Sequence, residues 1–161
     1  MKYTKLTIKI KSNDKPPYFI GSQLRGAFGY ALKKVVKKQL LDDNIYNKFF
    51  EQKDVTHKYR FDIRLGLQSY EFSFYLFEDE CDEVYNCISA FHEMITNIGL
   101  GKYNKTYEEF EIYLNKKLVY SNGELKQFDK YIKKFKQPKQ KKDFILRLET
   151  PLRIKKDGKY V

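Results

Sequence analysis

Apolar and polar residues alternate along several stretches of the chain, with the period of two that a half-buried strand requires. The alternation places Leu6, Ile8 and Ile10 on one face of the first stretch. A turn near Gly66 separates the second stretch from the third. The pattern predicts strands over residues 3–12, 57–65, 70–77 and 102–114.

Two other stretches show the helical period of 3.6 residues. The first runs from about residue 21 to 41, with an apolar face made of Leu24, Phe28, Ala31, Leu32 and Val35. The second covers residues 79–98 and begins with acidic side chains, which the helix dipole favours in a first turn. Its apolar face consists of Val84, Ile88, Phe91, Ile95 and Ile98. Cys81 and Cys87 fall within this second pattern and match no zinc motif, so we expect buried thiols.

The predicted elements follow the order β-α-β-β-α-β. This order is that of the ferredoxin-like (RRM-like) fold, an α+β architecture in which both helices cover one face of an antiparallel sheet. We expect residues 1–115 to form such a domain. Because this fold hosts many functions, it decides little about activity by itself.

Residues 116–142 are interpreted as a hairpin followed by a basic linker. The hairpin signal is the turn dipeptide Asn122-Gly123. Between residues 126 and 142, eight lysines stand against a single acid, Asp129. The alternatives for this part are a solvated connector and a connector with a short helix before Pro138.

Residues 143–161 alternate again, with a hairpin signal at Asp157-Gly158. We interpret them as the opening strands of a second, similar domain, and expect the chain to be the N-terminal part of a longer two-domain protein. An isolated hairpin is marginal in water, so its apolar residues need cover from the first sheet, from another copy or from a further segment. These residues are Phe144, Leu146, Leu148, Leu152 and Ile154.

Composition adds a large positive charge to this picture. Hydrophobic residues make up 42% of the 161 residues, which excludes a chain that is disordered throughout. The formal net charge of +11 favours a polyanionic partner, nucleic acid first, although AT-rich codon usage also enriches lysine. The sequence shows neither a signal peptide nor an apolar run of transmembrane length. We therefore expect a soluble, cytoplasmic protein with no membrane partner.

Two glycines stand inside the first predicted helix, where each costs about 0.5–1 kcal/mol relative to alanine. A helical wheel places Gly26 and Gly29 on the solvent face, opposite the apolar residues. Their expected neighbours are Ser22, Gln23, Tyr30, Lys33 and Lys37. A bare stripe of this kind lets a bulky partner approach the helix, and the lysines favour a sugar-phosphate backbone. The alternative is that another protein element packs on the stripe.

The stretch "FIGSQLRGAFGYALKK" resembles the first-helix signature of CRISPR-associated pre-crRNA-processing endoribonucleases of the RAMP superfamily. Three further stretches follow in the order seen in that family: "YEFSFYLFED", "AFHEMITNIGLGKYNKTYEEFEI" and "FILRLETPLRIKKDGKYV". The resemblance covers nearly the whole chain. It departs from the family pattern at Tyr30, where relatives often have histidine. It departs again in the stretch after the first helix, which lacks the cysteines that many relatives carry.

The resemblance implies a pair of ferredoxin-like domains that grip a CRISPR repeat RNA and cut it once without a metal or other cofactor. In that reaction the 2′-hydroxyl attacks the adjacent phosphorus and a 2′,3′-cyclic phosphate remains. Protein groups move the two protons and stabilise the phosphoryl charge. The implied partners are the repeat RNA, other Cas proteins and a second copy of the chain.

The candidate catalytic residues are His57, Tyr30 and Lys33. His57 is one of two imidazoles, and half-buried packing at a strand end is its alternative role; we expect His92 to be structural. The residues expected to contact RNA are Gln23, Arg25, Gly26, Gly29, Lys34, Lys37, Lys102, Lys133, Lys134 and Arg153. The structural alternatives are stacking for Tyr30, a solvated helix face for the lysines and a snorkelling position for Arg25.

Two other functions compete with pre-crRNA cleavage. One is a non-catalytic RNA-binding RAMP subunit of a CRISPR effector complex. The other is an unrelated ferredoxin-like module that binds ribosomal or messenger RNA. A cleavage assay in EDTA separates the first two functions, and a neighbouring repeat array in the genome separates both from the third.

Overall fold

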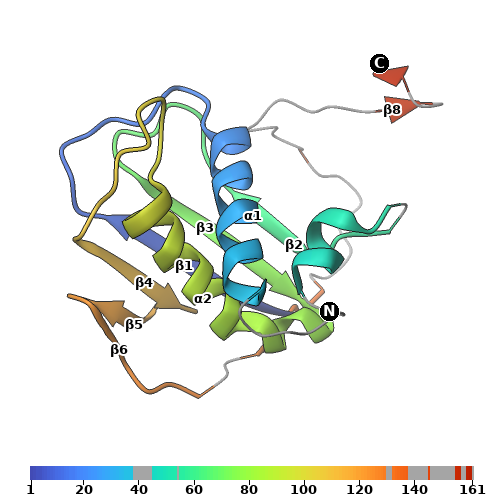
Figure 1. Cartoon of the computed structure of the whole chain (residues 1–161). Helices are drawn as coiled ribbons and strands as arrows, with labels where there is room; N and C mark the ends of the chain where they lie inside the picture. The colour runs from blue at the N-terminus through green and yellow to red at the C-terminus, as the bar shows by residue number, and fades with distance from the viewer. Residues whose placement is uncertain are drawn as a thin grey trace.

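An antiparallel sheet with helices on one of its faces forms the body of the protein in the computed structural model (Figure 1). The structure describes residues 1–37, 45–53, 55–129, 132–137, 145, 155–156 and 159–160. The sheet strands are β1 (Lys2–Ile10), β2 (Tyr59–Asp62), β3 (Glu71–Phe77), β4 (Phe110–Leu114), β5 (Lys117–Ser121), β6 (Glu124–Leu125) and β7 (Lys133–Lys134). Their order is β2-β3-β1-β4-β5-β6, with β7 also paired to β1.

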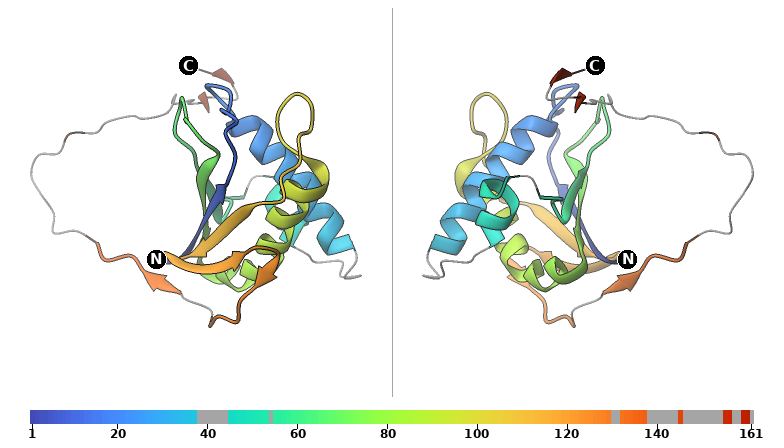
Figure 2. Two further views of the ribbon diagram at one scale, coloured as in Figure 1. Left: turned by 90° about the vertical axis from the view of Figure 1, so that its left-hand side faces the viewer. Right: turned by 90° about the vertical axis from the view of Figure 1, so that its right-hand side faces the viewer.

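The helical elements lie together on one side of this sheet, as the two views of Figure 2 show. They are α1 (Gly21–Lys37), the π-helical η1 (Asn47–Glu51), the 3₁₀ turn η2 (Glu78–Glu83), α2 (Val84–Glu93) and the π-helical η3 (Met94–Ile98). The predicted second helix is therefore a continuous run of three helical types, η2, α2 and η3. The described part of the first helix ends at Lys37, and its predicted last turn lies outside the described residues.

A cluster of aromatic rings joins α1 to the sheet. Phe28 is fully buried, and its ring centroid lies 4.9 Å from that of Phe74 on β3 and 4.6 Å from that of Phe91 on α2. Leu6 and Ile8 of β1 are fully buried beside them, as the alternation predicts. The helices and strands therefore share one hydrophobic core, because each presents its apolar face to the space between the helices and the sheet.

The first four strands have the order β2-β3-β1-β4, with α1 after β1 and α2 after β3. All their pairings are antiparallel. The architecture is α+β and is compatible with the ferredoxin-like arrangement expected from the sequence.

Two strands are shorter in the structure than the alternation in the sequence predicts. The strand expected over 57–65 is confined to β2. Tyr59 pairs with Leu76 near the end of β3, so His57 lies beyond that end, whereas residues 63–65 leave the strand although β3 begins only at Glu71. The strand expected over 102–114 is confined to β4. Residues 100–105 instead form a closed loop, in which Leu100 and Lys105 exchange two backbone hydrogen bonds.

Gly99 makes that loop possible. Its φ is +84°, and a Cβ built on it would lie 2.0 Å from the carbonyl oxygen of Asn104. Only glycine fits so close to backbone at a positive φ. The loop therefore keeps its glycine for steric reasons and ends the helical run at Ile98.

The sheet continues beyond residue 115. The predicted hairpin at Asn122-Gly123 is confirmed as β5 and β6, and both turn residues have positive φ. The short helix considered before Pro138 is wrong for the described residues, because β7 pairs with the first residues of β1. A two-stranded pairing of β8 (Lys155–Lys156) with β9 (Lys159–Tyr160) confirms the hairpin signal near the end. The five apolar residues expected to need cover there, from Phe144 to Ile154, lie outside the described residues.

The two cysteines are buried and free, as expected. Burial raises the pKa of both thiols, most strongly at Cys87. They are therefore unreactive core side chains. No helix in the described ranges is both long enough and apolar enough to cross a membrane.

Candidate nucleic-acid interface

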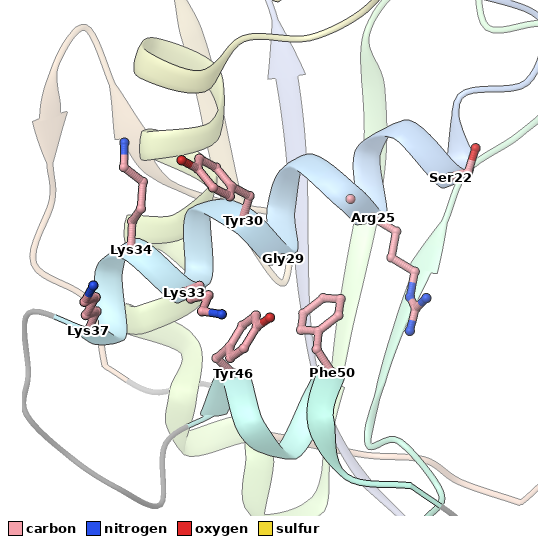
Figure 3. Close-up of a pocket in the computed structure, with 10 residues that line it drawn as sticks. Ser22, Arg25, Gly29, Tyr30, Lys33, Lys34, Lys37, Tyr46 and Phe50 are labelled. Atoms are coloured by element: carbon pink, nitrogen blue, oxygen red, sulfur yellow. The ribbon is translucent and has the colours of Figure 1, made fainter.

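A groove of about 730 Å³ runs along the exposed face of α1, between this helix and η1 (Figure 3). The first helix supplies one wall and part of the floor, and the aromatic residues of the η1 segment supply the other wall. The lining residues are Ser22, Arg25, Gly26, Gly29, Tyr30, Lys33, Lys34, Lys37, Tyr46 and Phe50. The described lining thus combines four cations with three aromatic rings and includes no acidic side chain.

The period of α1 explains why this face is exposed. Leu24, Phe28 and Val36 are buried against the core, so the opposite side of the helix faces solvent. Gly26 has open space around it, with no heavy atom within 4 Å of a Cβ built there. Tyr30 keeps 60% of its surface exposed. The predicted bare position on the helix is confirmed for Gly26.

The prediction is wrong for Gly29, which is buried rather than part of an exposed stripe. A Cβ at this position would lie 3.0 Å from two ring carbons of Phe50. The close approach of η1 therefore explains the glycine at position 29. This outcome is the alternative in which another protein element packs on the helix at the glycines. Val35 is likewise only half-buried, and Val36 takes the buried place on the helix.

The η1 wall is the part of the site that sequence reasoning missed. Phe49 is buried and anchors this segment to the core, where its ring centroid lies 4.3 Å from that of Tyr59. Phe50 and Tyr46 stack on each other with centroids 5.5 Å apart and face the groove (Figure 3). The spacing of four residues between these two aromatics was a usable signal, because it puts them on one side of a helical turn.

The cations of the groove are held in different ways. Lys33 lies over the ring of Tyr46, with Nζ 5.1 Å from the centroid. Arg25 lies over Phe50 at 5.3 Å and donates a hydrogen bond from Nε to the Tyr59 hydroxyl at 3.1 Å. This position agrees with a partly structural Arg25, although its side chain also lines the groove.

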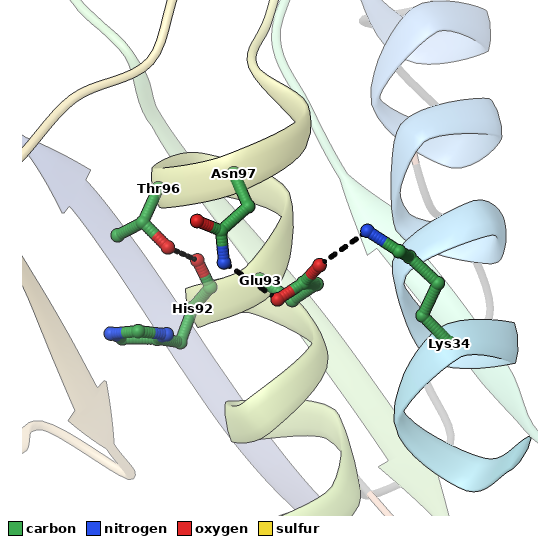
Figure 4. A network of polar contacts seen from close by, with 5 residues as sticks. All are labelled: Lys34, His92, Glu93, Thr96 and Asn97. Atoms are coloured by element: carbon green, nitrogen blue, oxygen red, sulfur yellow. Dashed lines mark hydrogen bonds and ion pairs between the residues drawn. The ribbon is translucent and has the colours of Figure 1, made fainter. Parts of the chain in front are cut away.

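Lys34 is engaged by the neighbouring helix (Figure 4). Its Nζ lies 2.8 Å from Oε1 of Glu93 on α2, and Asn97 donates a hydrogen bond to the other carboxylate oxygen at 2.7 Å. The hydrogen bond to Glu93 raises the pKa of Lys34. Lys34 thus has an acidic partner, whereas Lys37 lies at the end of α1 and is exposed.

A second hollow of about 290 Å³ adjoins the other side of α1. Gly26 and Tyr30 line both hollows, so the two hollows adjoin each other along α1. Gln23 lines the second hollow, together with Gly101 from the loop that contains the other predicted RNA contact, Lys102. Lys102 itself lies over the ring of Tyr103 at 5.6 Å.

The candidate catalytic residues are only partly brought together. Tyr30 and Lys33 both line the groove, but His57 does not. His57 is exposed, and its ring centroid lies 5.7 Å from that of Tyr59, the residue that accepts the hydrogen bond from Arg25. His57 is therefore neither in the predicted strand nor half-buried.

The other predicted residues lie elsewhere. Half-buried His92 packs between Phe110 and Tyr120, with centroids 5.9 and 5.6 Å away, as a structural residue would. Lys133 and Lys134 form β7. Arg153 lies outside the described residues. In the described part of the chain, no three His, Cys, Asp or Glu side chains gather as a metal site would require.

Comparison with known proteins adds no family to this picture: no family model matches the sequence, and no curated protein is significantly similar to it.

Proposed function

We propose that this protein is a ferredoxin-like domain of the RAMP type that binds CRISPR repeat RNA in the groove between α1 and η1. The observation that carries the proposal is the gathering of Lys33, Lys37 and Arg25 with three aromatic rings, one of them exposed, on a groove whose described lining has no acid. The strand order β2-β3-β1-β4 supports the ferredoxin-like part, and the resemblance of the first helix supports the choice of repeat RNA.

The groove offers the two kinds of contact that single-stranded RNA requires. Lysine ammonium groups attract phosphates, and aromatic faces stack on unpaired bases. Tyr30, at 60% exposure, presents such a face beside the open space at Gly26. A sugar-phosphate backbone can approach α1 closely at Gly26, because no side chain covers the helix there.

We extend the proposal to cleavage of the bound repeat. The 2′-oxygen forms a bond to the adjacent phosphorus while the bond from phosphorus to the 5′-oxygen breaks. A protein base takes the proton of the 2′-hydroxyl, and an acid gives a proton to the leaving 5′-oxygen. Lys33 would stabilise the charge on the phosphoryl oxygens. Tyr30 and His57 are the candidates for the proton transfers.

A second function, RNA binding without cleavage, is favoured by one observation. His57 does not line the groove, so the described lining contains no imidazole, the group best suited to acid–base chemistry near pH 7. Tyrosine has an unperturbed pKa of about 10 and is a poorer base. A non-catalytic RAMP subunit would need the groove but not the histidine.

A single-turnover assay with repeat RNA in EDTA separates the two functions. Cleavage predicts a shortened RNA with a 2′,3′-cyclic phosphate end, and it predicts that a repeat with 2′-deoxyribose at the cut site stays intact. His57→Ala and Tyr30→Phe then assign the proton transfers, since loss of an acid–base group lowers the rate by about 10²–10⁴-fold. A rate within about threefold of wild type removes the residue from that role. Binding without any product supports the non-catalytic function.

A further inference from the structure

The face of the sheet away from the helices (Figure 2) carries a second group of aromatic side chains, of which Phe135 is exposed and Tyr3, Tyr75 and Phe77 are half-buried. A hollow of about 330 Å³ lies on it. The residues that line this hollow are Met1, Tyr3, Arg60, Asp62, Tyr75, Phe77 and Phe135. They come from β1, β2, β3 and the segment after β7, so the surface is assembled from parts that are distant in the sequence.

Strand register explains why these side chains share one face. Tyr3 of β1 is directly opposite Phe77 of β3, and residues opposite each other in a pair point to the same side. Tyr75 follows on the same side of β3, because side chains two residues apart share a face. The fully buried Phe74 and Leu76 point the other way, into the core.

The rings form a platform that no described element covers. Tyr75 and Phe77 are nearly parallel, with an interplanar angle of 7° and centroids 6.1 Å apart. The ring of Tyr3 lies 6.1 Å from that of Tyr75. Phe135 extends the platform and keeps 56% of its surface exposed.

Cations surround the platform. Lys5 lies over the ring of Tyr75 at 5.3 Å, and Arg60 is opposite Tyr75 in the register of β2 and β3. Lys133 of β7 is opposite Tyr3. Asp62 is the single acid among the lining residues that the structure describes.

The other half of the same face is different, because its charges neutralise one another. Lys9 pairs with Glu71 at 3.2 Å, and Lys11 pairs with Glu111 at 2.7 Å. Tyr113 donates a hydrogen bond to Glu111 at 2.8 Å. Within the described residues, Lys5, Arg60 and Lys133 make no such ion pair. Net positive charge and uncovered rings therefore coincide in one half of the sheet face.

We propose that this aromatic platform, defined by Tyr3, Tyr75, Phe77 and Phe135, is a second binding surface for single-stranded RNA. Bases stack on the rings of the two central strands, β1 and β3, and Arg60 and Lys133 contact phosphates. Stacking on aromatic residues of a sheet face is a general way to hold unpaired bases, and the surplus of cations is complementary to a phosphate backbone rather than to an ordinary protein surface.

This inference rests on the proposed function in one respect, the premise that the protein binds RNA. The two surfaces lie on opposite sides of the sheet, since α1 covers the face into which Phe74 points. A single RNA molecule that contacts both must pass around an edge of the sheet. A short oligonucleotide therefore occupies one surface at a time.

The test uses a fluorescein-labelled oligouridine of about ten nucleotides, because its bases are unpaired and stackable. The variant is Tyr75→Leu with Phe77→Leu, which keeps the apolar character of the face but removes the rings. The matched control is Tyr113→Leu, on the half of the same face where charges are paired. Thermal unfolding of each variant establishes that it is folded.

Because the groove can still hold an oligonucleotide, the comparison is made in the background of Lys33→Ala with Lys37→Ala. There we expect the double leucine change to weaken binding about tenfold or more, and the control Tyr113→Leu to change it by less than about twofold. Quenching of tyrosine fluorescence by the oligonucleotide should persist in the groove variant Lys33→Ala with Lys37→Ala. Unchanged affinity of the leucine variant overturns the inference. If that variant also no longer self-associates, the platform is an interface between protein copies instead.

The same measurements keep the two proposals apart. Weaker binding in the groove variant alone leaves the proposed function standing and contradicts the platform. Weaker binding in the leucine variant alone supports the platform and contradicts the groove as the RNA site. A wild-type protein that binds no RNA contradicts both.

Discussion

Gly26 and Gly29 lie three residues apart on α1 but have different surroundings. Alanine at position 26 would meet nothing within 4 Å, whereas alanine at position 29 would meet the ring of Phe50 at 3.0 Å. We predict that Gly26→Ala raises the free energy of unfolding by up to about 1 kcal/mol, because alanine is the better helix former. The same variant should bind repeat RNA more weakly, because the added methyl group blocks close approach of the backbone.

Gly29→Ala provides the matched comparison in chemical denaturation. We expect it to lack the gain in stability, since the ring of Phe50 must move to admit the methyl group. Equal stabilisation by both alanines would contradict the packing of η1 on α1. Unfolding of Gly26→Ala would show that position 26 is itself a packing surface.

Glu80 predicts a pH effect that is independent of the RNA sites. Its side chain is buried in η2, and this burial raises the pKa of the carboxyl group above its ordinary value, with partial opposition from Lys48. The folded protein then binds the proton more tightly than the unfolded chain does. The ionised carboxylate therefore destabilises the fold at neutral pH, and the effect disappears as the pH falls below the ordinary glutamate pKa of about 4.3.

We therefore predict that Glu80→Gln is more stable than wild type at pH 7 and that the difference shrinks toward pH 4. Urea unfolding at both pH values measures it. A wild type that is the more stable of the two at pH 7 would show that the carboxylate makes favourable contacts that outweigh its desolvation.

At the scale of elements, the contact between α1 and α2 decides how the lysines of α1 act. Lys34 is paired with Glu93, while Lys37 is exposed one turn further on. We predict that Lys34→Ala weakens RNA binding less than Lys37→Ala does, because the charge of Lys34 is already balanced. Fluorescence anisotropy with the same RNA compares the two. The reverse order would mean that RNA displaces Glu93 and recruits Lys34.

The elements that local sequence determines were predictable, and those that depend on distant contacts were not. The apolar period located α1, and the turn dipeptide Asn122-Gly123 located the β5–β6 hairpin. The start of β2 was not predictable from its alternation, because it depends on where β3 ends.

The candidate site follows the same rule. Gly26, Tyr30 and Lys33 were assigned to one face from helical geometry alone, and the structure places all three on the groove. The environment of Gly29 was missed because it is set by Phe50, a residue 21 positions later in the chain. Alternation showed which strand residues share a face, but not which half of the sheet is neutralised by ion pairs.

At the scale of the whole molecule, the formal charge of +11 is divided unevenly. Ion pairs such as Lys9–Glu71 and Lys11–Glu111 neutralise one half of the sheet face. The described lining of the α1 groove, in contrast, contains cations and no acid. If net charge alone attracts RNA, replacing any lysine should weaken RNA binding by a similar amount. If the groove is the RNA site, replacing its lysines should weaken binding more than replacing lysines elsewhere.

The salt dependence of RNA binding measures this difference directly. Anisotropy titrations of repeat RNA at several salt concentrations compare wild type, Lys33→Ala with Lys37→Ala, and the control Lys15→Ala with Lys126→Ala, which removes the same charge from exposed positions outside the groove. We predict that the groove variant binds more weakly and that its log–log slope is shallower by about 0.7 for each phosphate that it no longer neutralises, while the control keeps the wild-type slope. A groove variant with the slope of wild type, or a control whose slope falls equally, would contradict the assignment of the α1 groove as the RNA site.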